Sequence, residues 1–121
     1  MLYDPRWEEK IVTMPLEGWQ IVLLKAADIV RRRGLAKYTQ RAGDGSVCVQ
    51  GAISVAVTGQ VYCSSRNEKY CEATRRLGQY LIAKGEEGAD ETGNAYWNNA
   101  PERTAEEVIA ALEGCAALVI S

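Results

Sequence analysis

Apolar residues between Leu16 and Arg33 recur at spacings of three and four, and this pattern constrains the fold more than any other feature of the chain. Such a period places one apolar stripe along an α-helix. Pro15 suits the first turn of this helix, and Arg31-Arg32-Arg33 followed by Gly34 is typical of a helix end, where cations face the negative end of the helix dipole. We predict a helix over residues 16–33 whose buried face includes Trp19, Leu23, Ala26 and Val30.

A short β-hairpin is predicted after this helix. Residues 35–41 and 46–50 flank an Ala-Gly-Asp-Gly turn at 42–45, whose residues tolerate positive φ. The next stretch, 51–59, stays open between strand and helix. Its β-branched residues alternate as in a strand, and propensity favours that reading, but its apolar residues would also line one side of a short helix.

Two capping boxes mark helix starts in the second half, at Ser65 to Glu68 and at Thr104 to Glu107. The first helix ends near Gly85, and residues 85–101 form a long polar loop before the second. The order helix, two strands, three helices predicts a mainly helical α+β fold. We expect one domain over residues 1–121, with residues 1–13 as an N-terminal arm.

The charge balance disfavours binding to nucleic acid. Among 121 residues, 14 are Lys or Arg and 16 are Asp or Glu, which gives a net charge of −2, whereas phosphate-binding proteins usually carry a basic excess. No apolar run approaches the ~18 residues that a membrane-spanning helix needs. The N-terminus lacks the features of a secretory signal, so we expect a cytoplasmic protein with no membrane partner.

The chain has no histidine, which excludes Ser-His-Asp and Cys-His catalysis and histidine-based metal chemistry within it. Its four cysteines, at 48, 63, 71 and 115, include no Cys-x-x-Cys pair, so neither a zinc site nor a cofactor is predicted. Cys48 is interpreted as a small buried apolar residue with an inert thiol. Asp90, Thr92 and Asn94 have the odd spacing of a calcium loop, but the glycine and closing glutamate are misplaced, which favours a solvated loop.

Two segments resemble an uncharacterised family of small actinobacterial and phage proteins, a domain of unknown function. They are Asp44-Gly-Ser-Val-Cys-Val-Gln-Gly-Ala-Ile53 and Trp97-Asn-Asn-Ala-Pro-Glu-Arg-Thr-Ala-Glu-Glu-Val-Ile109, which match Asp-Gly-x-Val-Cys-x-x-Gly-Ala and Trp-Asn-Asp…Arg-Thr-x-Glu-Glu-Val. A looser likeness to phage proteins includes Tyr38-Thr39-Gln40 and Cys48-Val-Gln-Gly51. Asn99 stands where the family usually has Asp. The resemblance implies a helix at 51–58, and no activity, substrate or cofactor.

Two groups of residues are candidates for a binding site. Trp97, Asn98 and Asn99 would offer an indole platform and two amides, although a core-capping Trp and backbone-bonding Asn side chains are the favoured interpretation. Arg31, Arg32 and Arg33, with Arg75 and Arg76, would bind phosphate, although helix-end cations and a solvated helix face are favoured.

The leading hypothesis is a non-enzymatic intracellular binding or regulatory protein, encoded by a phage or mobile element and acting on a host macromolecule, for example as an inhibitor. We expect a protein partner and leave a homo-oligomer open. One alternative is a nucleic-acid-associated factor that uses Arg31–Arg33 and Arg75–Arg76. A further alternative is an enzyme with carboxylate chemistry at residues such as Asp44 or Glu107.

Overall fold

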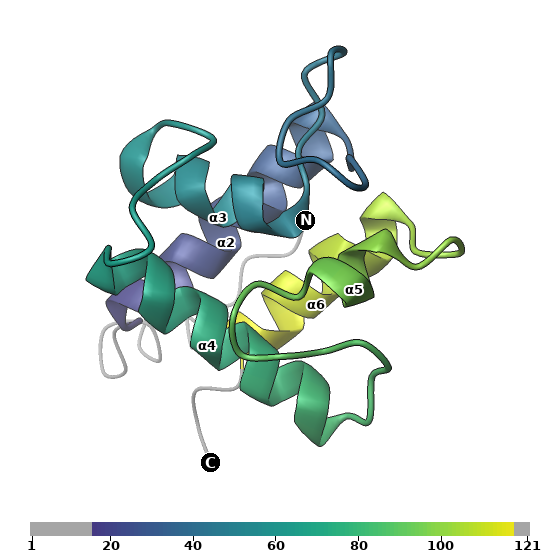
Figure 1. The fold of residues 1–121 in the computed structure, drawn as a ribbon. Helices are drawn as coiled ribbons and strands as arrows, with labels where there is room; N and C mark the ends of the chain where they lie inside the picture. Colours follow the sequence, from purple (N-terminus) through teal and green to yellow (C-terminus); the bar gives the residue numbers. More distant parts are fainter. Residues whose placement is uncertain (1–15, 118–121) are drawn as a thin grey trace, which may run out of the picture.

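The computed structural model describes residues 16–117, in which helices pack around one core (Figure 1). α2 (Gly18–Arg33) runs antiparallel to α6 (Ala105–Ala117). The start of α2 therefore lies beside the end of α6, where the Gln20 amide donates to the Ala116 carbonyl at 2.9 Å. The remaining helices are α3 (Val49–Thr58), α4 (Glu68–Ala83) and the short α5 (Ala95–Asn99). Within residues 16–117, no helix is both long and apolar enough to cross a membrane.

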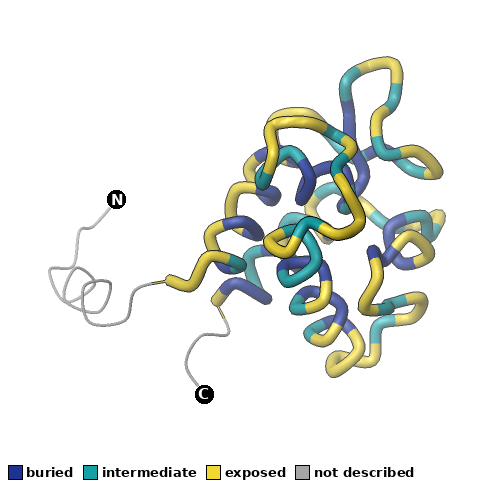
Figure 2. Tube along the Cα trace, turned by 60° about the vertical axis from the view of Figure 1, so that its left-hand side comes forward, coloured by how far each residue is buried: buried dark blue, intermediate teal, exposed yellow. Residues whose placement is uncertain are grey.

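The helix predicted from the apolar period is confirmed as α2. Leu23, Ala26 and Val30 are fully buried, and the buried positions recur along the inner sides of the helices (Figure 2). Trp19 is only partly buried, and the Arg76 guanidinium lies 4.9 Å from the centre of its ring. The helix begins at Gly18, two residues later than predicted; Pro15 lies outside the described residues.

The predicted β-hairpin is wrong, and with it the α+β class, because the described residues form helices and no sheet. The turn itself is present, with Gly45 N donating to Ala42 O at 3.0 Å. The two strands are absent. In their place Val47 forms one isolated β-bridge with Leu35 and a second isolated β-bridge with Arg41. Tyr38, at φ 65°, turns the first segment back on itself, and the second segment enters α3 after Cys48.

Residues 51–58 are helical, as the family resemblance implied and against their β-propensity. Ala52 and Ile53 are buried, and α3 packs against α2 and α4. Gly51 is required there, because a Cβ at this position would overlap the carbonyl oxygen of Gln40. Gly59 ends the helix in the left-handed conformation, at φ 83°. Burial against two helices therefore outweighs the strand preference of the β-branched residues.

One of the two predicted capping boxes is confirmed. Glu107 N donates to Thr104 Oγ1 and Thr104 N donates to Glu107 Oε1, both at 3.2 Å. The box at Ser65 is wrong, because α4 begins at Glu68 and its cap is Asn67, whose Oδ1 accepts from Tyr70 N at 3.0 Å. Asparagine is as good an N-cap as serine, so Asn67 can take the role that was predicted for Ser65.

Candidate functional site

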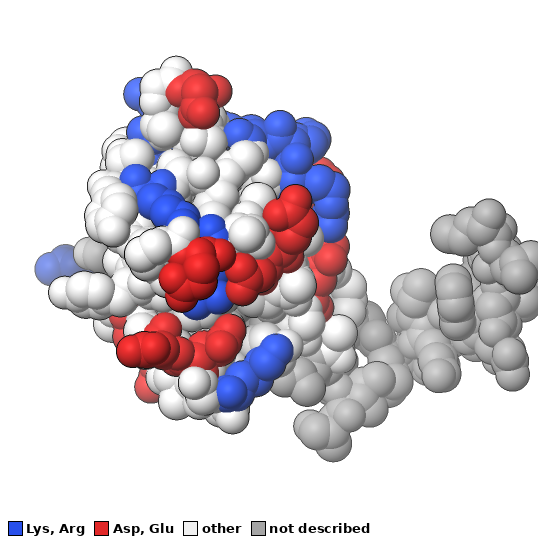
Figure 3. Space-filling view, turned by 90° about the vertical axis from the view of Figure 1, so that its right-hand side faces the viewer, with Lys and Arg blue, Asp and Glu red and all other residues white. Residues whose placement is uncertain are grey.

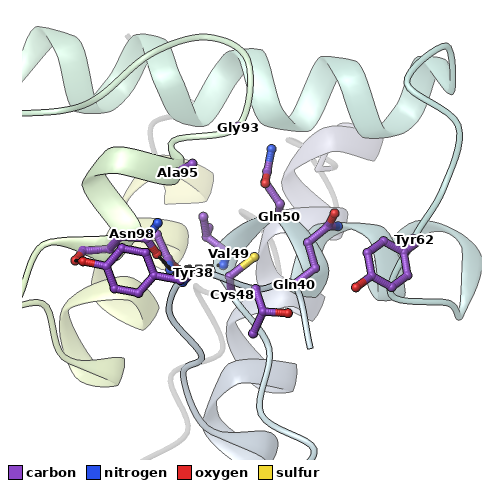
Figure 4. Close-up of a pocket in the computed structure, with 11 residues that line it drawn as sticks. Tyr38, Gln40, Cys48, Val49, Gln50, Tyr62, Gly93, Ala95 and Asn98 are labelled. Carbon is purple, nitrogen blue, oxygen red and sulfur yellow. Dashed lines mark hydrogen bonds between the residues drawn. The ribbon is translucent and has the colours of Figure 1, made fainter. Parts of the chain in front are cut away.

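A pocket of about 380 Å³ lies where residues 38–40, the start of α3 and α5 meet (Figure 4). Figure 4 shows Tyr38 and Tyr62 on either side of Cys48 and Gln50. Every lining side chain is uncharged. The lining residues are Tyr38, Thr39, Gln40, Cys48, Val49, Gln50, Tyr62, Gly93, Ala95, Asn98 and Asn99.

Asn98 holds the walls of the pocket together. Its side chain is buried, its Oδ1 accepts from Val49 N at 3.0 Å, and its Nδ2 donates to Ala36 O at 2.9 Å. One amide thereby connects α5 to the first turn of α3 and to the segment before Tyr38. The neighbouring Asn99 Oδ1 accepts from Tyr38 N at 2.8 Å, which supports the left-handed backbone at Tyr38.

Several hydrogen-bonding groups on the pocket wall remain open. Gln40 Nε2 donates to Val61 O at 3.1 Å, while its Oε1 has no partner among the described residues. Asn99 Oδ1 accepts from Tyr38 N and from Asn98 Nδ2. The Nδ2 of Asn99 itself donates no hydrogen bond to any described residue. Gln50 also lines the pocket, and neither Oε1 nor Nε2 of its side chain forms a hydrogen bond with residues 16–117. The wall therefore offers both donors and acceptors.

Trp97 does not line this pocket, unlike the two asparagines predicted with it. Its ring is 1% exposed in the core, and the Arg103 guanidinium covers it at 4.4 Å from the ring centre. The indole Nε1 donates to Glu86 Oε1 at 3.3 Å, and Arg103 Nε donates to the Trp97 carbonyl at 3.0 Å. The indole is thus a core residue and offers no open platform.

The candidate arginines form two separate groups. Arg31 pairs with Glu113 at 2.8 Å, Arg32 pairs with Asp28 at 3.1 Å, and Arg33 Nε donates to the Gly45 carbonyl at 2.8 Å. The hydrogen bond and charge of Glu113 raise the pKa of Arg31. Acidic side chains lie beside the basic ones across the face shown in Figure 3.

The second arginine group lies at the opposite end of α2. Arg75 and Arg76 both pair with Glu72, at 3.3 and 3.5 Å, and Arg76 also covers Trp19. Trp19 precedes Arg31 by 12 helical positions, or roughly 18 Å at 1.5 Å per residue. The five arginines therefore do not share one phosphate-sized site.

The candidate carboxylates are bonded within their own loops. Asp44 Oδ1 accepts from Ser46 Oγ and N at 2.6 and 3.0 Å, and these bonds lower its pKa. The backbone bond from Thr104, assisted by its hydroxyl and by Arg103, lowers the pKa of Glu107.

Asp90, in the loop that resembled a calcium site, is likewise bonded to its own backbone. Burial by itself would raise the pKa of Asp90, but hydrogen bonds from Asn94, Thr92 and Gly93 together lower it. Among residues 16–117, no three His, Cys, Asp or Glu side chains gather as a metal site.

Cys48 is the cysteine that lines the pocket. It is 7% exposed, and its Sγ accepts from Gly51 N at 3.4 Å as the cap of α3. Burial raises the pKa of the Cys48 thiol, so little thiolate forms near neutral pH. The same effect raises the pKa of Cys115 to about 11, and all four cysteines are free.

Cys48 should react slowly with a thiol reagent in the native protein. Because its pKa is raised, the reactive thiolate is scarce at pH 8 and its labelling rate should keep rising above pH 9. Peptide mass mapping after timed labelling measures each cysteine separately, and the half-buried Cys63 and Cys71 serve as internal controls. Native labelling of Cys48 as fast as that of Cys63 would contradict this reading.

A family model, described as a family of unknown function (DUF6197), matches residues 14–118. The chain belongs to DUF6197. This confirms the predicted membership of an uncharacterised family. No curated protein and no solved structure matches this DUF6197 chain significantly. All pocket residues lie inside the matched range, so the pocket is part of the DUF6197 domain.

Part of this pocket is built from residues that the sequence patterns single out. Asn98 and Asn99 were candidates, and the looser likeness included Tyr38-Thr39-Gln40 and Cys48-Val-Gln-Gly51, which supply six further lining residues. Tyr62, Gly93 and Ala95 were missed, because no motif links them to the others. Only the fold brings the start of α3 beside the loop before α5.

Proposed function

We propose that this DUF6197 protein is a non-enzymatic binding module that recognises another protein through the pocket. The observation that carries the proposal is the lining, which combines two tyrosines with amide side chains and contains no charged residue. The cores of protein interfaces are enriched in tyrosine and depleted of charge in the same way. Tyr38 and Tyr62 are 80% and 61% exposed, so both rings are available to a partner.

The state of the reactive groups supports binding over the two alternatives. The thiol of Cys48 is buried and caps a helix, and the carboxylates of Asp44 and Glu107 are held by their own loops. These arrangements suit structural roles better than nucleophilic or acid–base chemistry. Nucleic-acid binding through the arginines is disfavoured because Arg31, Arg32, Arg75 and Arg76 are paired with acidic residues.

The biological setting that we propose follows from the sequence. Encoding by a phage or mobile element is supported by the resemblance of the two sequence segments, and inhibition of a host process is one form that binding to a host protein would take. These predictions concern where a protein partner would be sought, and the pocket does not depend on them.

Capture of partners by pocket variants tests the proposed function. Tyr62→Ala should lower the amount of a specifically captured protein by about tenfold or more, because buried interface tyrosines commonly contribute 1–2 kcal/mol or more. Tyr96→Ala is the matched control, since Tyr96 is 83% exposed and lies outside the pocket lining. The measurement is quantitative mass spectrometry of proteins retained from host lysate by each variant.

The proposal fails if Tyr62→Ala and Gln50→Ala retain the same proteins in the same amounts as the wild type. It also fails if the retained material is nucleic acid that is lost steeply as salt rises, since that behaviour marks phosphate contacts.

A further inference from the structure

We infer that the group entering the pocket is an uncharged carboxamide carried by a short segment of the partner, an Asn or Gln side chain with its adjoining backbone. This inference rests on the proposed function. The open wall groups are the Gln40 Oε1 acceptor, the Asn99 Nδ2 donor and both ends of the Gln50 amide. A carboxamide carries one acceptor oxygen and two N–H donors in one plane, so it offers a complementary group to each of these residues.

Binding a charged group in this pocket would cost free energy of desolvation. No lining side chain carries a charge that could compensate for the lost hydration of a carboxylate or ammonium group. Lys37 precedes Tyr38 but does not line the pocket, and its Nζ is turned to the carbonyls of Ala100 and Pro101, at 2.6 and 3.1 Å.

The start of α3 does not supply an anion site either. Val49 N already donates to the Asn98 Oδ1, and Gly51 N donates to the Cys48 Sγ. Helix N-termini bind anions through free N–H groups, and two of those in this first turn are used internally. The pocket therefore selects for a neutral polar group.

Gly93 sets the position of the Gln50 amide. A Cβ at position 93 would overlap Gln50 Nε2 and would lie 2.6 Å from its Cδ. Gly93→Ala would therefore push the amide away from the loop. The displaced atoms are the end of a flexible side chain, so the fold can keep its shape while the pocket wall changes.

The volume of the pocket indicates what length of partner it holds. About 380 Å³ is near the lower end of the range for small-molecule sites, which is roughly 300–1,000 Å³. One side chain and its adjoining peptide groups fit in such a space. The remainder of the partner would contact the exposed rings of Tyr38 and Tyr62 at the rim.

Titration of the isotope-labelled full chain with N-acetyl-glutamine methylamide, followed by NMR, tests this inference. The probe should shift the backbone amides of residues 38–40, 48–51 and 93–99 with a Kd on the order of 1 mM, the value typical of a ligand with so few atoms. The corresponding glutamate and lysine probes should bind at least about tenfold more weakly, because their charges must be buried without a partner. Uracil serves as a planar nucleobase probe.

Two variants place the effect at the Gln50 amide. Gln50→Ala and Gly93→Ala should each weaken binding of the glutamine probe by about fivefold or more. In the double variant, Gly93→Ala should cause no further loss of affinity beyond that of Gln50→Ala. Gly18→Ala is the control, because a Cβ there would meet nothing within 4 Å.

The inference is overturned by equal or tighter binding of the glutamate or lysine probe, by binding of uracil alone, or by no response to the glutamine probe at about tenfold the expected Kd. If any of these occurs while protein capture still depends on Tyr62, the proposed function stands and only the ligand class is wrong. If capture does not depend on the pocket, the proposed function fails whatever the probes show.

Discussion

Replacing Asn98 by alanine should lower the free energy of unfolding by about 3–5 kcal/mol, since each buried polar group left without a partner costs roughly 1–3 kcal/mol. The variant removes the acceptor of Val49 N and the donor to Ala36 O, both inside the protein. Urea denaturation of both proteins at neutral pH measures the difference. A loss below about 1 kcal/mol, as for an exposed polar residue, would mean that Asn98 does not hold the pocket walls together.

A second substitution at this position separates shape from hydrogen bonding. Asn98→Asp keeps the size and one acceptor, but a carboxylate cannot donate to Ala36 O. Burial should raise the folded-state pKa of the new carboxyl above its unfolded value of about 3.9, and only the protonated form can donate. The loss of unfolding free energy relative to wild type should therefore be smallest near pH 4, and it should grow as pH rises through the folded-state pKa. A deficit independent of pH would contradict this account.

Gly78→Ala should lower the free energy of unfolding by about 3 kcal/mol, at the upper end of overpacking costs. A Cβ on Gly78 would overlap the carbonyl oxygen of Asp90 and lie 2.8 Å from both Asp90 C and Glu91 Cα. These are backbone atoms of a loop that the Asp90 carboxylate holds together, so they cannot move aside cheaply. The clash should exceed the gain of about 1 kcal/mol that alanine brings to a helix interior.

Gly114→Ala is the matched control for Gly78→Ala, because Gly114 also lies inside a helix. Its added Cβ would meet the hydroxyl end of the Tyr80 side chain, which can rotate away. Stability should stay within about 1 kcal/mol of wild type, since the helix preference of alanine offsets the displacement. Equal stability of both variants by urea denaturation would show that the loop at Asp90 yields as easily as a side chain.

Part of the candidate site was visible in the sequence and part was not. Asn98 and Asn99 were candidates because two amides follow the indole of Trp97, and the structure places both at the pocket. Both also bond to backbone, as the favoured interpretation expected. Nothing in the sequence around Gln50 or Gly93 indicated that they touch. That contact depends on how α3 lies against the loop before α5, a relation between residues more than forty positions apart.

Features that depend only on neighbouring residues could be predicted from the sequence. The period of three and four determined α2, the Thr104–Glu107 box determined the start of α6, and the Gly-rich segment determined the turn at 42–45. Each is decided within a few residues by hydrogen bonds or side-chain spacing.

Tertiary packing decided the rest. Residues 49–58 have a strand-like composition, but burial against α2 and α4 makes them helical. Val47 pairs with two segments at once, so single bridges replace the expected hairpin. The pocket forms where α5, α3 and the segment at Ala36 meet, and Asn98 joins these three through two hydrogen bonds. Local propensities of a few tenths of a kcal/mol per residue are outweighed when a segment buries apolar surface and satisfies its backbone against distant elements.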